Sequence, residues 1–388
     1  MARKYEQTHS WLTFSFDIRN ISFRSWMLLG AAQSKCLHIQ GTPLDQKHAE
    51  KLHAVYLAKG AQATTAIEGN TLTEQEVLDI LEKRSHIPQS KQYLVKEVEN
   101  VIAAYNTIVD KEITQADTRL TVEEICRYNA MVLHDIEVAD YVAPGRLREC
   151  SVVVMNYVGA PAEDCQYLLQ RLCDTLNSTE FSLGDGFVQA TGILKAILAH
   201  LYLVWIHPFG DGNGRTARLI EAKFCASAGI PKPACQLLSN FYNSTRTRYY
   251  AKLSESSKRS DFSIFLDYAL QGLVDMLDEQ IGIIRHYQIQ STWQNTVHTV
   301  VNGSTQAAER RRQIALALFE HLEGVPRTSV PVLSAHVAEL FRSAGKYKTL
   351  TRDLNYLESA GLVILHGKVV SPNIAKILAW QPVSKVVA

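Results

Sequence analysis

One stretch of twelve residues decides how the fold and chemistry of this chain are interpreted. It reads His207-Pro208-Phe209-Gly210-Asp211-Gly212-Asn213-Gly214-Arg215-Thr216-Ala217-Arg218. Apolar residues follow it as far as Cys225, which predicts a helix that begins just after the glycines. Glycines let backbone N–H groups approach an anion closely, and the N-terminus of a helix adds partial positive charge. The stretch therefore predicts a phosphate-binding site.

The polar side chains of the same stretch support this prediction. Arg215 and Arg218 are three residues apart, so they share one helix face and can contact two phosphate groups. Asp211 offers a hard oxygen ligand, and Mg²⁺ usually takes one or two carboxylates together with phosphate oxygens. His207 lies where a general base is needed. Each residue alone is typical of an ordinary buried histidine, turn or solvated face, but their joint order favours a functional site.

The stretch resembles the Fic family signature, His-Pro-Phe-x-Asp/Glu-Gly-Asn-Gly-Arg-x-x-Arg, with no departure. The resemblance extends over roughly residues 25–280. It implies a mainly α fold, a helical bundle with a small β-hairpin flap. It also implies an enzyme that transfers AMP from ATP to a Ser, Thr or Tyr hydroxyl of a protein. Related kinases tend to carry Lys at the position of Gly214, so this glycine favours AMP transfer.

The resemblance also implies a role for each matching residue. His207 takes the proton from the target hydroxyl, and Asp211 holds Mg²⁺. ATP is the co-substrate, and the target protein is the partner. The implied nucleotide-binding residues are Gly210, Gly212, Asn213, Gly214, Arg215, Arg218, Tyr249 and Tyr250.

A second informative segment, Thr64-Thr65-Ala66-Ile67-Glu68-Gly69-Asn70, ends a predicted helix at about 46–68. A helix C-terminus favours cations, so Glu68 indicates a partner elsewhere in the chain. Thr64 lies one turn earlier and faces the same way. The segment resembles the N-terminal form of the Fic inhibitory motif, Ser/Thr-x-x-x-Glu-Gly/Asn. This resemblance implies that Glu68 pairs with Arg218 and occupies the place of the ATP γ-phosphate.

The segment from Pro144 to Val154 has a different composition. Pro144-Gly145 indicates a turn, and the β-branched Val152, Val153 and Val154 favour a strand. The segment resembles the Fic flap, which implies that an extended piece of the target pairs with this strand. A structural hairpin with nothing docked on it is the alternative.

Composition limits the other possibilities. The chain has 388 residues, 46% of them hydrophobic, which allows two or three domains with sizeable cores. The formal net charge of +1 provides no global attraction to nucleic acid or to a membrane. Seven cysteines without a Cys-x-x-Cys pair predict reduced thiols and a cytoplasmic location. We expect no signal segment and no membrane-spanning run.

Four regions are expected along the chain. A helical region at 1–113 contains the inhibitory helix, and the catalytic core follows at 114–287. A polar linker at 288–305 then leads to a domain at 306–388, where three helices and a hairpin resemble a winged helix-turn-helix. From Glu309 onward there are 11 Lys and Arg and 6 Asp and Glu, a local net charge of +5. This domain can bind DNA or protein, or act as scaffolding.

Three functions are therefore open. The favoured one is AMP transfer to proteins, including the chain itself, held back by the chain's own N-terminal helix. The second is removal of AMP, with Glu68 aligning a water molecule. The third is a DNA-associated regulator that acts through 306–388. A homo-oligomer is compatible with each of them.

Overall fold

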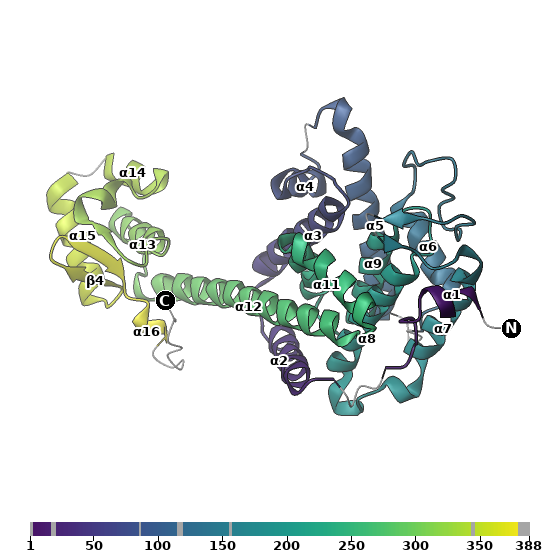
Figure 1. The fold of residues 1–388 in the computed structure, drawn as a ribbon. Helices are drawn as coiled ribbons and strands as arrows, with labels where there is room; N and C mark the ends of the chain where they lie inside the picture. The colour runs from purple at the N-terminus through teal and green to yellow at the C-terminus, as the bar shows by residue number, and fades with distance from the viewer. Residues whose placement is uncertain are drawn as a thin grey trace. The chain divides into compact units, whose positions relative to one another are not determined.

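The computed structural model describes residues 3–16, 21–84, 87–114, 119–154, 157–342 and 346–378. The chain forms two compact units, Met1–Ile281 and Gly282–Ala388, here called unit 1 and unit 2. Most of the described residues are helical, as the sequence predicts, and the strands are short (Figure 1).

Unit 1 is built from helices and one small hairpin. Its helices are α1 (Lys4–Thr8), α2 (Phe23–Gln40), α3 (Gln46–Ile67), α4 (Glu74–Leu81), α5 (Gln92–Thr114), α6 (Val122–Val132), α7 (Cys165–Asn177), α8 (Val188–Ile206), α9 (Asn213–Ser227), α10 (Leu237–Ser244), α11 (Arg246–Arg259) and the first part of α12 (Ser263–Val300). Its strands are β1 (Val153–Val154) and β2 (Tyr157–Val158). Short 3-10 helices occur at Gln89–Lys91, Ala162–Asp164, Thr179–Phe181, Asp185–Phe187 and Lys232–Ala234.

The central helix α8 is apolar on every side, which is typical of a helix enclosed by others. It packs against α9, α2 and α7. By length and composition, Asp185–Ile206 is long and apolar enough to cross a membrane, which the sequence analysis had not expected. About two thirds of its most apolar window (67%) is buried inside the structure, as in the core helix of a globular domain. This packing holds the end of α8 and the start of α9 together.

Helix α3 carries the predicted inhibitory segment and has clear ends. Asp45 caps its N-terminus by accepting a hydrogen bond from the backbone N–H of His48. Its other end is Glu68, followed by Gly69 at a φ of 107°, a value that favours glycine. A capping box opens α4, because Thr73 and Glu76 bond reciprocally. Buried residues of α3 pack against α10 and α5, which fixes the direction of its C-terminal end.

The strand predicted at 152–154 is present in shortened form. β1 and β2 pair antiparallel, with Val153 opposite Val158 and Val154 opposite Tyr157. The N–H of Gly159 donates to the carbonyl of Val152 at 3.0 Å, which extends the pairing by one bond. This two-stranded hairpin, β1 and β2, is called the flap below.

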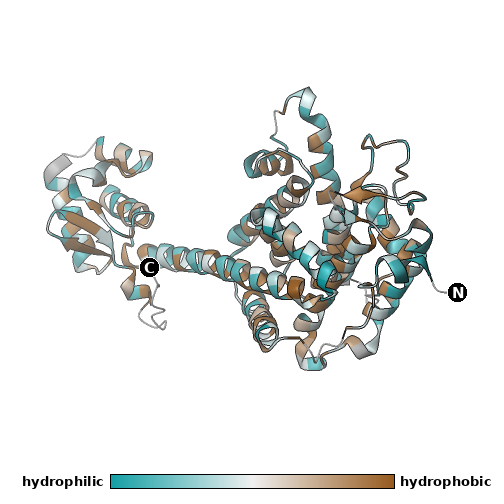
Figure 2. Cartoon of the chain, viewed as in Figure 1, coloured by the Kyte–Doolittle hydropathy of each residue, from teal (hydrophilic) through white to brown (hydrophobic). Residues whose placement is uncertain are grey.

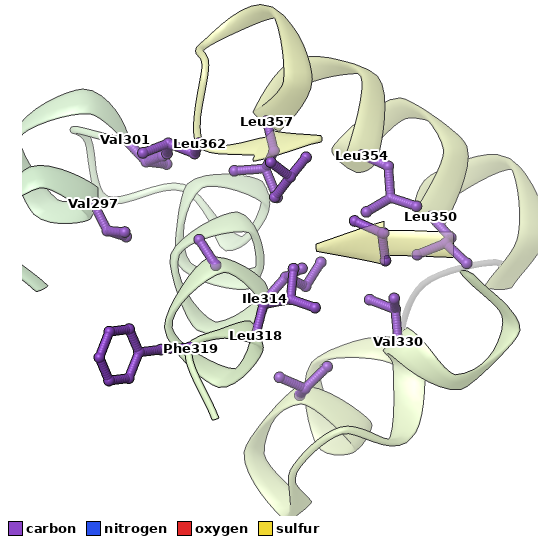
Figure 3. Close-up of a cluster of buried hydrophobic side chains, with 14 of the residues drawn as sticks. Val297, Val301, Ile314, Leu318, Phe319, Val330, Leu350, Leu354, Leu357 and Leu362 are labelled. Atoms are coloured by element: carbon purple, nitrogen blue, oxygen red, sulfur yellow. The ribbon is translucent and has the colours of Figure 1, made fainter. Parts of the chain in front are cut away.

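Unit 2 contains the rest of α12 and a small mixed domain. Its elements are α13 (Gln306–Leu318), β3 (Val325–Pro326), a 3-10 helix at Arg327–Val332, α14 (Ala335–Arg342), α15 (Lys346–Ser359), β4 (Val363–His366), β5 (Val369–Pro372) and α16 (Ala375–Leu378). The strands form an antiparallel sheet in the order β3-β5-β4. Figure 3 shows the apolar side chains of α12, α13, α15 and the sheet region that meet in its core. The predicted hairpin is confirmed, whereas the winged-helix interpretation stays a prediction.

The expected polar linker at 288–305 is mostly helical. Helix α12 continues to Val300, and α13 begins at Gln306 after its cap Thr305. Polar residues were mistaken for loop residues here, because they occupy the exposed sides of a helix whose Trp293 and Val297 are buried. Figure 2 shows polar and apolar residues intermixed along this helix. The other expected domain boundaries stay predictions.

Close packing of α8 on α9 gives a testable consequence at Gly192. A Cβ there would lie 2.2 Å from the Cβ of Ala228 and 2.9 Å from the carbonyl oxygen of Phe224. Gly192→Ala should therefore lower the free energy of unfolding by about 1 to 3 kcal/mol through overpacking. Gly30→Ala in α2 is the matched control, since no atom lies within 4 Å of its Cβ. The control should gain about 0.5 to 1 kcal/mol from helix propensity. Urea denaturation measures both, and equal effects would contradict the packing argument.

Candidate functional site

The twelve-residue stretch forms a loop between two helices. His207 ends α8 in the left-handed conformation, at a φ of 50°. Gly212 lies at a φ of 75° and caps α9, and a Cβ there would lie 2.9 Å from the side-chain nitrogen of Asn129. Gly212 has no side chain that could cap the N-terminus of α9. This helix N-terminus suits an anion, and phosphate binding there stays a prediction.

Side chains within the loop hold its shape. Asn213 accepts a hydrogen bond from the N–H of Phe209 and donates one to its carbonyl, both at 2.9 Å. The hydroxyl of Thr216 donates to the carbonyl of Gly212 at 2.8 Å. The two hydrogen bonds with Phe209 fix the side chain of Asn213, and its part in nucleotide binding stays a prediction. Gly210 allows the loop to approach Val142, whose Cγ2 would lie 3.0 Å from an added Cβ.

His207 is prepared to act as a neutral base. Its Nδ1 lies 3.4 Å from the carbonyl of Val204, which can only accept, so Nδ1 carries the proton and Nε2 keeps its lone pair. Burial lowers the pKa of His207 to about 4, and the Arg148 guanidinium acts in the same direction. The Val204 carbonyl and the carboxylates of Glu68 and Asp211 oppose this shift. The imidazole is therefore uncharged at neutral pH.

Arg148 fixes this turn and was not identified from the sequence. Its Nε donates to the carbonyl of His207 and its Nη1 to that of Cys150, both at 2.7 Å. Its Nη2 donates to the carbonyl of Ala160, which follows the flap. The side chain is almost fully buried. One guanidinium therefore ties both ends of the flap to the left-handed turn at His207, and a planar fork of donors suits this task better than a lysine would.

The two arginines of the signature are buried at the N-terminal end of α9. The side chain of Arg215 is 4% exposed and pairs with Asp211 and Glu97 at 3.3 and 3.5 Å. The side chain of Arg218 is 2% exposed. Among the described residues, Nε of Arg215 and Nη1 of Arg218 have no hydrogen-bond acceptor. Buried donors without acceptors cost free energy unless an anion supplies them, so these groups fit a phosphate ligand.

The contact expected between Glu68 and Arg218 is present. Oε1 of Glu68 lies 2.6 Å from Nη2 of Arg218. Thr64 accepts at the same guanidinium twice, through its hydroxyl and through its carbonyl, the latter at 2.9 Å. Burial alone would raise the pKa of Glu68, but the neighbouring Arg218 outweighs it and holds this pKa below its usual value. Glu68 is therefore ionised at neutral pH. Helix α3 thus places a carboxylate on the arginine that was predicted to contact phosphate.

Gly214 lies directly under this carboxylate. A Cβ at this position would lie 2.2 Å from Oε1 of Glu68 and 3.0 Å from Nη1 of Arg218. The absence of a side chain at 214 is therefore a condition for the observed position of Glu68. From the sequence, this glycine was predicted to let phosphate approach and to favour AMP transfer, whereas its contact with Glu68 was not predicted.

A cavity of about 540 Å³ opens beside these residues. Glu68, His207 and Gly214 line it together with Tyr249 and Tyr250 of α11. The rest of its wall is mainly apolar and comes from α3, the end of α8, α11, the flap and the N-terminal segment: Thr8, His9, Trp11, Ile67, Val154, Tyr157, Val158, Val204, Trp205, Leu253, Ser254, Ser257 and Lys258. A lining that combines charged, aromatic and apolar side chains suits a nucleotide.

Asp211 offers one carboxylate for a metal ion. Its side chain is half exposed, and Oδ1 accepts from the N–H of Gly212 at 2.5 Å and contacts Arg215. No group of three or more His, Cys, Asp or Glu residues that could hold a metal occurs among the described residues. A single carboxylate fits Mg²⁺ that takes its remaining ligands from phosphate and water.

The fold and the site define a mainly helical protein with an anion site at the N-terminus of a central helix. Residues 119–225 match the family model described as Fic/DOC family. Protein adenylyltransferase fic-1 of Caenorhabditis elegans is 29% identical over 222 residues, 57% of this chain and 41% of the relative. Protein adenylyltransferase Fic of Nematostella vectensis is 32% identical over 171 residues, 43% of this chain and 37% of the relative. Residues 119–225 are therefore similar to the Fic/DOC family.

A solved structure extends the likeness of fold. The crystal structure of a Fic family protein from Desulfovibrio desulfuricans G20 covers 91% of this chain and 97% of its own, with a TM-score of 0.56 and 18% identity. This likeness shows the fold alone. The chain spans about two fifths of the length of the curated relatives described above.

Sequence reasoning missed several residues of the site. Arg148, Glu97, Asn129, Tyr157 and Trp11 all contact signature residues or line the cavity. Their partners lie tens to more than a hundred residues away, so no local spacing indicates them. The only available signal was an arginine, Arg148, between the turn and the valines of the predicted flap.

The position of Gly214 leads to a prediction for Gly214→Ala. The added Cβ should displace the Glu68 carboxylate from Arg218, because a flexible carboxylate moves more easily than helix backbone. Calorimetry with a non-hydrolysable ATP analogue should show a gain in affinity below about tenfold, smaller than the gain that Glu68→Gly gives, because the same Cβ also crowds an incoming phosphate.

The control is the same change in a chain that carries Glu68→Gly, where the alanine should give no gain. A gain of equal size in that background would show that the effect does not pass through Glu68.

Proposed function

We propose that this protein transfers AMP from ATP to a hydroxyl group of a protein and that its helix α3 restrains the reaction. The observation that carries the proposal is the Glu68–Arg218 ion pair, whose Glu68 lines the cavity together with His207. The relatives' names support the reaction, and the signature residues support the site. A cytoplasmic location and a homo-oligomer stay predictions.

The proposed reaction uses the residues as follows. The lone pair of Nε2 of His207 accepts the hydroxyl proton while that oxygen attacks the α-phosphorus of ATP. The bond from the α-phosphorus to the bridging oxygen breaks, and pyrophosphate leaves. The N–H groups at the start of α9 and the buried Arg215 and Arg218 contact the phosphate oxygens. Catalysis of this kind depends on in-line placement and charge stabilisation more than on covalent help.

Asp211 would hold Mg²⁺ against the phosphates, and the bound ion would supply charge neutralisation on the leaving group. Arg215 pairs with the Asp211 carboxylate on one side, so the position of this carboxylate is set before nucleotide binds.

Glu68 restrains the reaction through Arg218. The γ-phosphate of ATP and the Glu68 carboxylate are both anions that require the same guanidinium. While Glu68 pairs with Nη2 of Arg218, the γ-phosphate of ATP has to bind away from this arginine. The α-phosphorus is then turned out of line with the attacking hydroxyl.

Glu68→Gly should raise AMP transfer about tenfold to a hundredfold, the equivalent of one charge-assisted hydrogen bond. Label from α-labelled ATP should appear on protein, and label from γ-labelled ATP should not. The double variant Glu68→Gly with Arg218→Ala should return to a low rate, because the released arginine is then missing.

Purified chain tested on itself and on a cell lysate provides the measurement. A Glu68→Gly variant that labels no more protein than the parent would refute restraint by α3, and label from the γ-position would refute AMP transfer.

The pH dependence of Glu68→Gly tests the role of His207. A base with a pKa of about 4 stays neutral above that pH, and removal of Glu68, which raises this pKa, shifts it further down. We expect kcat/KM to stay flat between about pH 5.5 and 8, where an unperturbed histidine would lose activity near 6.5. His207→Ala should remove transfer and leave binding of the ATP analogue intact. An inflection near 6.5, or full activity in His207→Ala, would contradict the assignment.

Removal of AMP is the second candidate function. Glu68 is ionised and lines the same cavity as His207, so it can align a water molecule on the AMP–protein bond. A purified AMP-modified target separates the two directions: the parent should release AMP, and Glu68→Gly should not.

The alternative of a DNA-associated regulator has less structural support. Arg310 and Arg311 both bond to the buried Asp353, at 2.5 and 2.9 Å, and Arg312 bonds to Glu309. These ion pairs within unit 2 engage three of the basic residues that give this region its net positive charge, so these three are less available to DNA.

A further inference from the structure

The segment at the N-terminal end of unit 1 reaches the cavity of the candidate site. Thr8, His9 and Trp11 line it together with His207 and the flap. Residues 3–16 are here called the strap. The sequence analysis assigned no role to the strap, and it lies outside the residues that match the family model.

The strap is fastened at both ends. Asp164, which is buried, accepts from the backbone N–H of Tyr5 at 2.9 Å and from Arg3 at 3.2 Å. At the other end, the ring of Phe14 packs 5.1 Å from that of Tyr202 on α8. The middle of the strap is therefore held across the flap.

His9 covers one edge of the flap. Val153 and Val158 are opposed, and the bond from Gly159 N–H to the Val152 carbonyl marks them as a non-hydrogen-bonded pair. The N–H and carbonyl of Val158 therefore point away from β1, toward the outer edge of β2. Nε2 of His9 lies 2.9 Å from this carbonyl and donates to it. An added strand consequently has to pair with β1, where Val153 is 60% exposed.

Trp11 continues the contact into the cavity wall. Its ring lies 4.9 Å from that of His9 and 6.4 Å from that of Tyr157, measured between centroids. The hydroxyl of Tyr157 donates to the carbonyl of Trp205 at 2.6 Å, close to the end of α8. The strap, the flap and the end of α8 thus form one connected wall beside the site.

We propose that His9 and Trp11 are positioning residues that hold the flap by its β2 edge and complete the wall against which the base of the nucleotide binds. The inference rests on the proposed function, because it takes ATP as the occupant. The phosphates belong near Gly214 and Arg218. The planar base then belongs beside Trp11 and Tyr157, which line the same cavity and offer stacking and burial.

The test uses Trp11→Ala and His9→Ala in the full chain with Glu68→Gly, so that α3 does not limit binding. Calorimetry should show about tenfold weaker binding of a non-hydrolysable ATP analogue, the size of a lost base–aromatic contact. Inorganic tripolyphosphate, which has no base, should bind all variants equally. For AMP transfer, KM for ATP should rise by the same factor while kcat changes less than about twofold.

Lys4→Ala is the matched control. Lys4 lies in the strap, but both side chains of its ion pair with Glu163 are exposed, and neither residue lines the cavity. Exposed pairs contribute little, so this variant should bind like its parent. Trp11→Phe should restore most of the affinity.

A second measurement requires no substitution. Hydrogen exchange in the Glu68→Gly chain should slow at residues 8–11 and 157–158 when the analogue binds, and should not slow there with tripolyphosphate. This result holds even if an alanine variant does not fold.

The outcomes are distinguishable. A Glu68→Gly chain that binds no ATP analogue overturns the proposed function and this inference together. Normal binding with unchanged affinity in both alanine variants overturns the inference alone. Equal losses for the analogue and for tripolyphosphate also overturn it, because the strap would then act on the fold as a whole.

Discussion

The candidate site is organised around the buried guanidinium of Arg218. A charge removed from water requires a compensating anion and acceptors for its donors. Thr64 and Glu68 provide them from a helix 150 residues away in the sequence. The packing of α3 within unit 1 thus positions the groups that pair with Arg218, the cation that contacts phosphate in the proposed reaction. Under the proposed function, an entering nucleotide has to compete with Glu68 for Arg218.

The same helix end explains why an acidic residue stands where the helix dipole disfavours it. Glu68 lies at the C-terminus of α3, where partial negative charge collects, and its pKa is nevertheless low because Arg218 is close. The unfavourable interaction of Glu68 with the dipole of its own helix is therefore offset by the ion pair with Arg218. A carboxylate held in this way is easier to detach than one with support from its own helix, which suits a contact that a triphosphate has to displace.

Prediction from the sequence worked best where one short segment contains both the candidate site residues and the residues that begin or end a helix. The loop from His207 to Arg218 and the end of α3 each contain their own helix boundary, so their positions followed directly. Arg148 could not be found in this way, because its acceptors are backbone carbonyls of distant segments. The linker before α13 failed for a different reason. Polar residues were taken as a loop, although the spacing of the buried Trp293 and Val297 is helical.

Gly214 is required both by the proposed phosphate site and by the observed position of Glu68. An anionic phosphate needs bare backbone at this position, and so does the carboxylate of Glu68, whose Oε1 would lie 2.2 Å from a Cβ. In the proposed function, the Glu68 carboxylate and the phosphate of ATP therefore require the same missing side chain, since both are oxyanions that approach one helix N-terminus. A residue that excluded Glu68 would also crowd the nucleotide, so a side chain here cannot release the restraint cleanly. Release has to come from movement of Glu68 or of α3, which leaves the phosphate site itself unchanged.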